Sequence, residues 1–63
     1  MFVEILHRKT KNVVAIGNFK AGESLTYIND WVKRHNETID RWHSIGHATV
    51  FRTENYFIRF LQK

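Results

Sequence analysis

The sequence contains no cysteine, which excludes disulfide bonds and any metal site built from thiolates. It also contains no proline and only three glycines, so its composition is unlike that of a linker. By contrast, 43% of its residues are hydrophobic and 14% are aromatic, and a disordered chain is poor in such bulky apolar groups. We therefore expect residues 1–63 to form one folded domain.

Long hydrophobic runs are also missing. No stretch approaches the roughly 18 apolar residues that a membrane-crossing helix requires. The segment 1–8 is short and interrupted by charged residues, unlike a secretory signal. Together with the absence of cysteine, these features predict a cytoplasmic protein that does not bind a membrane.

Charge is moderately positive and dispersed. Ten basic and six acidic residues produce a net charge of +4 at pH 7, without a run of five like charges. A basic protein attracts acidic partners, including nucleic acid, but the same charge also serves solubility. Charge alone therefore leaves both interpretations open.

The apolar pattern predicts four strands and one helix. Segments 2–8, 13–19, 47–53 and 56–62 are rich in β-branched and aromatic residues and are separated by polar turns or by the helix. A helix over 23–36, with Gly22 or Ser24 as its N-cap, explains an apolar stripe of Leu25, Ile28, Trp31, Val32 and His35. Segment 37–46 is predicted to be a loop. The expected fold is α+β, with the order ββαββ: a four-stranded, mainly antiparallel sheet with one helix packed on one face.

Two-residue turns would fix which side chains share a face of the sheet. A turn at Thr10–Lys11 places Val3, Ile5, Val14 and Ile16 on one face, and Phe2, Leu6, Val13, Ala15 and Phe19 on the other. A turn at Glu54–Asn55 groups Thr49, Phe51, Tyr56, Ile58 and Phe60.

One helix can cover only one side of such a sheet, so apolar residues on the second side are expected to meet another molecule. This hypothesis predicts a protein or dimer interface, and a homodimer would bury it. If the turns have other lengths, several of these residues would instead lie on the face that packs in the core. Trp42, in the predicted loop, is either a lid over the core or an exposed anchor for a partner. The predicted interface residues are Phe2, Leu6, Val13, Phe19, Trp42, Val50, Phe57 and Leu61.

The alternative partner is nucleic acid, because aromatic side chains interleaved with cations can stack on bases and bind phosphates. No RNA-binding sequence motif, zinc-finger spacing or glycine-rich phosphate loop supports it. The residues that would make these contacts are Arg8, Lys9, Lys11, Arg41, Arg52 and Arg59.

Catalysis is the third interpretation, as a minimal histidine-dependent nuclease. His7 beside Arg8, or His43 beside Arg41 and Ser44, has suitable chemistry but no spacing that shows convergence. His43 and His47 are four residues apart, as metal ligands on a helix would be, but they fall where a predicted loop enters a predicted strand. We therefore expect no metal, no cofactor and no enzymatic activity. The preferred function is a small regulator, inhibitor or adaptor that docks on a protein partner as a homodimer.

Overall fold

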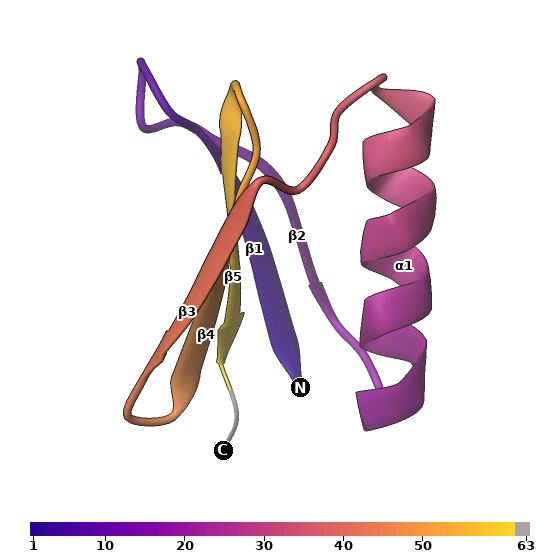
Figure 1. Ribbon diagram of the computed structural model, residues 1–63. Coiled ribbons are helices and arrows are strands. Elements are labelled where there is room, and N and C mark those ends of the chain that lie inside the picture. The colour runs from indigo at the N-terminus through magenta and orange to yellow at the C-terminus, as the bar shows by residue number, and fades with distance from the viewer. Residues whose placement is uncertain (62–63) are drawn as a thin grey trace.

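The computed structural model describes residues 1–61, without the side chains of Ala21 and Ile45, and contains five strands and one helix. The strands pair antiparallel in the order β2-β1-β5-β4-β3, so β1 and β5, which are far apart in sequence, are neighbours in the sheet. The helix lies on one side of this sheet (Figure 1). The elements are β1 (Phe2–His7), β2 (Val13–Asn18), α1 (Ala21–Arg34), β3 (Arg41–Ile45), β4 (Ala48–Arg52) and β5 (Tyr56–Leu61).

The predicted four-stranded ββαββ arrangement is wrong, because the segment predicted to be a loop contains β3. This strand pairs with β4 along its whole length, from Arg41 opposite Arg52 to Ile45 opposite Ala48. Gly46 has a φ of +59° and connects the two strands with His47. A two-residue connection that begins with glycine is a hairpin signal, so the sequence carried evidence for this strand.

The core lies between α1 and the face of the sheet that α1 covers. Val3 and Ile5 of β1 lie beside Ile58 and Phe60 of β5, and the helix contributes three buried residues. Full burial of each large apolar side chain stabilises the fold by about 1.5–3 kcal/mol. The helix residues in this core are Ile28, Trp31 and Val32.

The helix begins at Ala21 instead of residue 23, and its N-cap is Lys20, not Gly22 or Ser24. The Lys20 side chain makes no cap hydrogen bond, but its carbonyl accepts hydrogen bonds from the N–H groups of residues 23 and 24. Ser24 is buried and Leu25 is 53% exposed. The packed face of α1 is therefore rotated from the predicted stripe, away from Leu25 and toward Ser24.

A β-bulge changes the predicted faces of the first hairpin. The register shifts between Ile5 and Leu6, so the C-terminal half of β2 is displaced by one residue relative to β1. Ala15 therefore lies opposite Ile5 in the core, whereas Ile16 lies opposite Glu4 on the other face. The predicted placement of Val14 and Ile16 beside Val3 and Ile5 is wrong.

The predicted register of the second hairpin is confirmed. Phe51 lies opposite Ile58, and Thr49 lies opposite Phe60, as a two-residue turn at Glu54–Asn55 requires. The predicted last strand extended to Gln62, which lies outside the described residues.

Candidate docking surface

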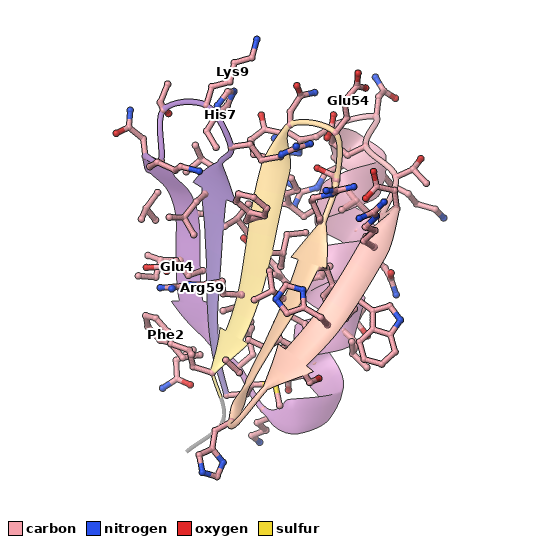
Figure 2. All side chains as sticks on the ribbon, turned by 60° about the vertical axis from the view of Figure 1, so that its left-hand side comes forward. Phe2, Glu4, His7, Lys9, Glu54 and Arg59 are labelled. Atoms are coloured by element: carbon pink, nitrogen blue, oxygen red, sulfur yellow. The ribbon has the colours of Figure 1, made fainter. Side chains whose placement is uncertain are left out.

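The face of the sheet that points away from α1 is the candidate site, and we call it the outer face. Alternation along the strands places every second side chain on it. Figure 2 shows Phe2, Glu4 and Arg59 on this side, with the helix behind the sheet. The described side chains of the outer face are those of Phe2, Glu4, Leu6, Val13, Ile16, Asn18, Arg41, His43, Ala48, Val50, Arg52, Phe57, Arg59 and Leu61.

Apolar cross-strand pairs occupy both ends of the outer face. Phe2 lies opposite Leu61 at one end, and Leu6 lies between Phe57 and Val13 at the other. Most of these side chains are half-buried against one another, and Val13 is exposed. No element formed by residues 1–61 covers this face (Figure 1).

An ion pair between Glu4 and Arg59 separates the two apolar ends. The Arg59 guanidinium donates to the Glu4 carboxylate across β5 and β1. The Glu4 side chain is only 15% exposed, so its charge is largely shielded by its neighbours and by Arg59. The centre of the face is therefore locally neutral.

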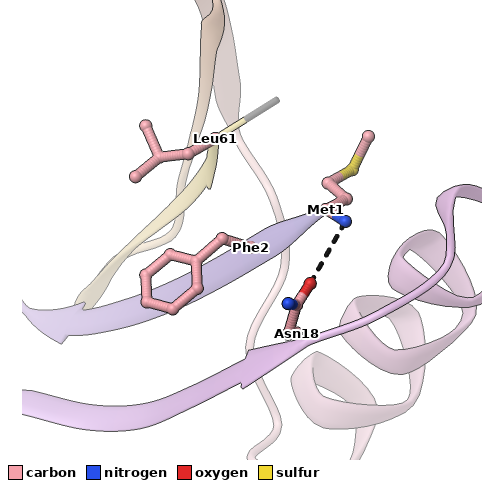
Figure 3. Close-up of a pocket in the computed structure, with 4 residues that line it drawn as sticks. All are labelled: Met1, Phe2, Asn18 and Leu61. Carbon is pink, nitrogen blue, oxygen red and sulfur yellow. Dashed lines mark hydrogen bonds between the residues drawn. The ribbon is translucent and has the colours of Figure 1, made fainter. Parts of the chain in front are cut away.

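A hollow of about 430 Å³ opens at the Phe2 end (Figure 3). It is lined by Met1, Phe2, Asn18 and Leu61, and the Met1 nitrogen donates to Asn18 Oδ1 at 3.3 Å. Its mainly apolar lining suits an apolar side chain of a partner.

The opposite end carries a group of cations around Phe57. Arg8 Cζ is 5.6 Å and Lys11 Nζ is 5.2 Å from the centroid of the Phe57 ring, within the range of cation–π attraction. Arg52 is the cross-strand neighbour of Phe57, and Arg41 is the neighbour of Arg52. We call Arg8, Lys11, Arg41 and Arg52 the basic corner.

Hydrogen bonds fix part of the basic corner. Arg8 Nη1 donates to the carbonyl oxygens of Thr53 and Glu54, at 3.1 and 2.7 Å. Arg52 Nε lies 3.3 Å from Asp40 Oδ1. Among residues 1–61, Arg8, Lys11 and Arg41 have no carboxylate partner, so this end of the face carries uncompensated positive charge.

Phe19 does not join the outer face. Its ring stacks on Tyr27 of the helix, with a centroid distance of 4.5 Å, and covers Gly17. The β-bulge is the physical reason, because it reverses the face on which the second half of β2 was expected to present its side chains.

Trp42 is also separate from the outer face. It lies on the edge strand β3 opposite Phe51, which packs against the core, so its side chain is on the helix side of the sheet. Because it is 64% exposed, the interpretation of Trp42 as a lid over the core is wrong. Lys9 lies at the tip of the β1–β2 hairpin, away from the centre of the outer face (Figure 2).

Of the residues in the second nuclease hypothesis, Arg41 and His43 share the outer face, but Ser44 does not. His43 and Ser44 are consecutive in β3 and point to opposite faces, and Ser44 Oγ instead lies 3.0 Å from Thr49 Oγ1. Within residues 1–61, no group of three histidine or acidic side chains is placed to bind a metal ion.

Two other histidines pack around Tyr56. His7 contacts its ring edge-on at 5.4 Å, while His35 stacks on Trp31 at 3.8 Å and lies 6.3 Å from Tyr56. His7 Nδ1 accepts the N–H of Lys9 at 3.2 Å. Through these contacts, both rings pack between β1, β5 and α1.

Sequence reasoning missed the role of Glu37. Its carboxylate accepts hydrogen bonds from Thr53 Oγ1 at 2.7 Å, and from the backbone N–H and side-chain amide of Asn55 at 3.2 and 3.1 Å. The Thr53 hydroxyl, followed by the Asn55 donors and the charge of His35, lowers the pKa of Glu37 against the opposing effect of burial. No local pattern in 37–46 indicated these distant partners.

No helix within residues 1–61 has the length and apolar character needed to cross a bilayer. Comparison with protein-family models, with curated proteins and with solved structures finds no match to this chain.

Proposed function

We propose that this chain is a non-enzymatic interaction domain that docks on a protein partner through the outer face of its sheet. One observation carries the proposal: α1 covers one side of the sheet, while the other side presents apolar side chains that no element among residues 1–61 covers. Apolar surface gathered on one face in this way is typical of a binding site.

The charges of the outer face indicate the partner's chemistry. Glu4 and Arg59 neutralise each other at the centre, but the basic corner retains uncompensated cations. A partner with an apolar centre and an acidic rim complements this pattern. A second copy of the chain would place another positively charged face against it, so the expected homodimer is the less favourable occupant.

The arrangement around Phe57 also favours protein over nucleic acid. Base stacking needs an accessible aromatic face, but Arg8 and Lys11 lie over the Phe57 ring. In a protein complex, these cations can stay on the ring and still meet acidic side chains at the rim.

Affinity capture from a lysate of the source cell, treated with nuclease, tests the proposal. The wild-type chain is compared with Phe57→Asp, Phe2→Asp and the matched control Leu25→Asp, which places the same carboxylate on exposed helix surface. A partner of the outer face is captured by wild type and Leu25→Asp but not by the two face variants. With the purified partner, we expect each face variant to weaken binding by about thirtyfold or more.

The same experiment separates the alternatives. Binding that resists high salt and nuclease supports a protein partner, whereas a ligand that nuclease removes and that dissociates steeply with salt is nucleic acid and overturns the proposal. Sedimentation of the purified chain detects the homodimer, and a dimer broken by Phe57→Asp would assign the face to a second copy. If the wild-type chain and all three variants captured the same partner equally well, the outer face would not be the binding site.

A further inference from the structure

We infer that the free edge of β3 is a second binding site, which accepts an extended segment of another protein as an additional antiparallel strand. This segment has an aromatic residue followed directly by an acidic one. The site uses backbone groups at the rim of the sheet and the side chains of Trp42 and Arg41, of which only Arg41 belongs to the outer face. The inference does not depend on the proposed function.

Backbone groups at the β3 edge are available for such pairing. β3 is the last strand of the sheet, and among the described elements it pairs with β4 alone (Figure 1). A two-residue turn joins the two strands, so Ile45 and Ala48, which flank the turn, exchange backbone hydrogen bonds. Bonded and non-bonded pairs alternate along an antiparallel ladder, which places Trp42 and Ser44 in non-bonded pairs. Their N–H and C=O groups therefore point toward the open edge.

Arg41 favours an acidic residue in the added strand. It is exposed and lies opposite Arg52, whose Nε is 3.3 Å from the Asp40 carboxylate. Among residues 1–61, Arg41 itself has no carboxylate partner. A residue of the added strand opposite Arg41 would be its neighbour on the side away from Arg52. Opposite charges at such cross-strand positions stabilise a sheet by about 0.2–1 kcal/mol, so Asp or Glu is favoured there.

Trp42 favours an aromatic residue in the added strand. Its side chain is 64% exposed on the helix side of the sheet, opposite Phe51, which in turn lies opposite Ile58. An aromatic residue opposite Trp42 would extend this apolar row and cover the indole, and aromatic cross-strand pairs are stabilising. Because the added strand runs antiparallel to β3, the residue opposite Trp42 comes directly before the residue opposite Arg41. The order is therefore aromatic, then acidic.

A second copy of the chain does not offer this pattern. Neither of the two edge strands, β2 and β3, contains an acidic residue, and β2 contains no aromatic residue. Asp40, which precedes β3, is already engaged with Arg52, because its carboxylate is paired with the guanidinium and its N–H donates to the Arg52 carbonyl at 2.9 Å. Pairing with β2 or β3 of a second copy would leave Arg41 without a carboxylate, and positive charge on an edge strand opposes pairing with an identical one.

A blocked peptide with the sequence Val-Thr-Thr-Tyr-Glu serves as the probe. Strand addition takes affinity from backbone hydrogen bonds and specificity from alternate side chains. We expect the peptide, at millimolar concentration, to shift the amide NMR signals of Trp42 and Ser44 and to protect these protons from exchange. The matched control, Val-Thr-Thr-Glu-Tyr, has the same composition but places Glu on the side of Trp42. It should bind at least about threefold more weakly.

N-methylation of the peptide tests the backbone contact without altering the protein. A methyl group on the Tyr nitrogen removes the donor to the Trp42 carbonyl, and the expected loss of affinity is about fivefold or more. A methyl group on the preceding Thr nitrogen is the control, because that N–H points away from β3. It should change affinity by less than about twofold. Equal effects of the two methyl groups would contradict strand addition.

Arg41→Glu tests the charge. Wild type should prefer the Glu-ended peptide to a Lys-ended one at low salt, and the difference should shrink as salt screens the charges. Arg41→Glu should reverse this preference, whereas Phe57→Asp should bind the probe peptide as wild type does. The loss of this edge and the loss of the outer face are therefore distinguishable.

Several outcomes would overturn the inference: equal affinity for the Tyr-Glu and Glu-Tyr peptides, a preference for Glu that persists in Arg41→Glu, or no change at Trp42 and Ser44 with either peptide. Protection of β2 amides by the peptide would place the site at the other edge. A dimer, detected by sedimentation, in which the Trp42 and Ser44 amides are protected without peptide would assign the edge to a second copy and would overturn the inference as well.

Discussion

The carboxylate of Glu37 joins the segment after α1 to the turn between β4 and β5. Thr53 is fully buried at this junction; its hydroxyl donates to Glu37 and accepts the N–H of Tyr56 at 3.0 Å. The Arg8 guanidinium donates a hydrogen bond to the carbonyl oxygen of the same Thr53. A few polar residues therefore position both the turn and one cation of the basic corner.

Glu37→Gln should make stability less sensitive to acid. Because the pKa of Glu37 is lowered from its ordinary value of 4.5, the unfolded chain binds the proton more readily than the folded one. The stabilisation from this carboxylate is therefore present above about pH 4.5 and is lost as pH falls through the lower folded pKa. At pH 7 we expect the variant to be about 1 kcal/mol less stable than wild type.

Thermal unfolding followed between pH 7 and pH 3 measures this effect. The difference in Tm between wild type and Glu37→Gln should shrink as the solution is acidified. Glu54→Gln, an exposed change in the same turn, is the control and should leave wild-type behaviour nearly unaltered at every pH. A Tm difference that stays constant with pH would contradict the assigned role of the carboxylate.

At the scale of elements, the ring of Phe19, the residue that follows β2, packs against the helix. The Phe19 ring lies over Gly17 and stacks on Tyr27, so a side chain at position 17 would compete with that ring for space. A Cβ added at Gly17 would lie 2.7 Å from Phe19 Cε2, whereas one added at Gly22 in the helix would meet nothing within 4 Å.

Gly17→Ala should therefore destabilise the domain by about 1 kcal/mol or more, because Phe19 must give up part of its stacking. Gly22→Ala should be neutral or stabilise by up to about 1 kcal/mol, since alanine is the better helix former. Urea unfolding of both variants measures the contrast. Phe19→Leu should reduce the cost of Gly17→Ala when the two are combined; an equal cost in both backgrounds would show that the ring is not the obstacle.

The elements differ in how much of them local sequence could reveal. The helix and the second hairpin were predictable, because a 3.6-residue stripe around Ile28 and an alternation around Ile58 are local patterns. The bulge at Val14 was not, since one extra residue in a continuous apolar run does not show in the alternation of apolar and polar residues. That residue reversed the expected face of Phe19, although Phe2, Leu6, Phe57 and Leu61 do lie on the outer face as the pattern indicated.

At the scale of the whole molecule, pairing between β1 and β5 joins the first hairpin to the β3–β5 meander. It runs from Phe2 opposite Leu61 to His7 opposite Tyr56. This pairing creates the outer face, because it brings Phe2 beside Leu61 and Leu6 beside Phe57. Strand order could not be read from the sequence, because the alternation of side chains defines the two faces of each strand but is compatible with many choices of neighbouring strand. The sequence therefore predicted most residues of the candidate surface, but not which of them would be neighbours on it.

A sheet joined in this way should unfold as one cooperative unit. The core is shared by β1, β5 and α1, so Trp31 should lose its buried surroundings when the sheet loses its pairing. In a Trp42→Phe background, Trp31 is the remaining tryptophan, and its fluorescence and far-UV circular dichroism should report the same urea midpoint. Ile58→Val should lower the free energy of unfolding by about 0.5–1.5 kcal/mol and move both curves together. Ile16→Val, on exposed surface, should move neither; separate fluorescence and dichroism transitions would instead mean that the helix leaves the sheet before its strands part.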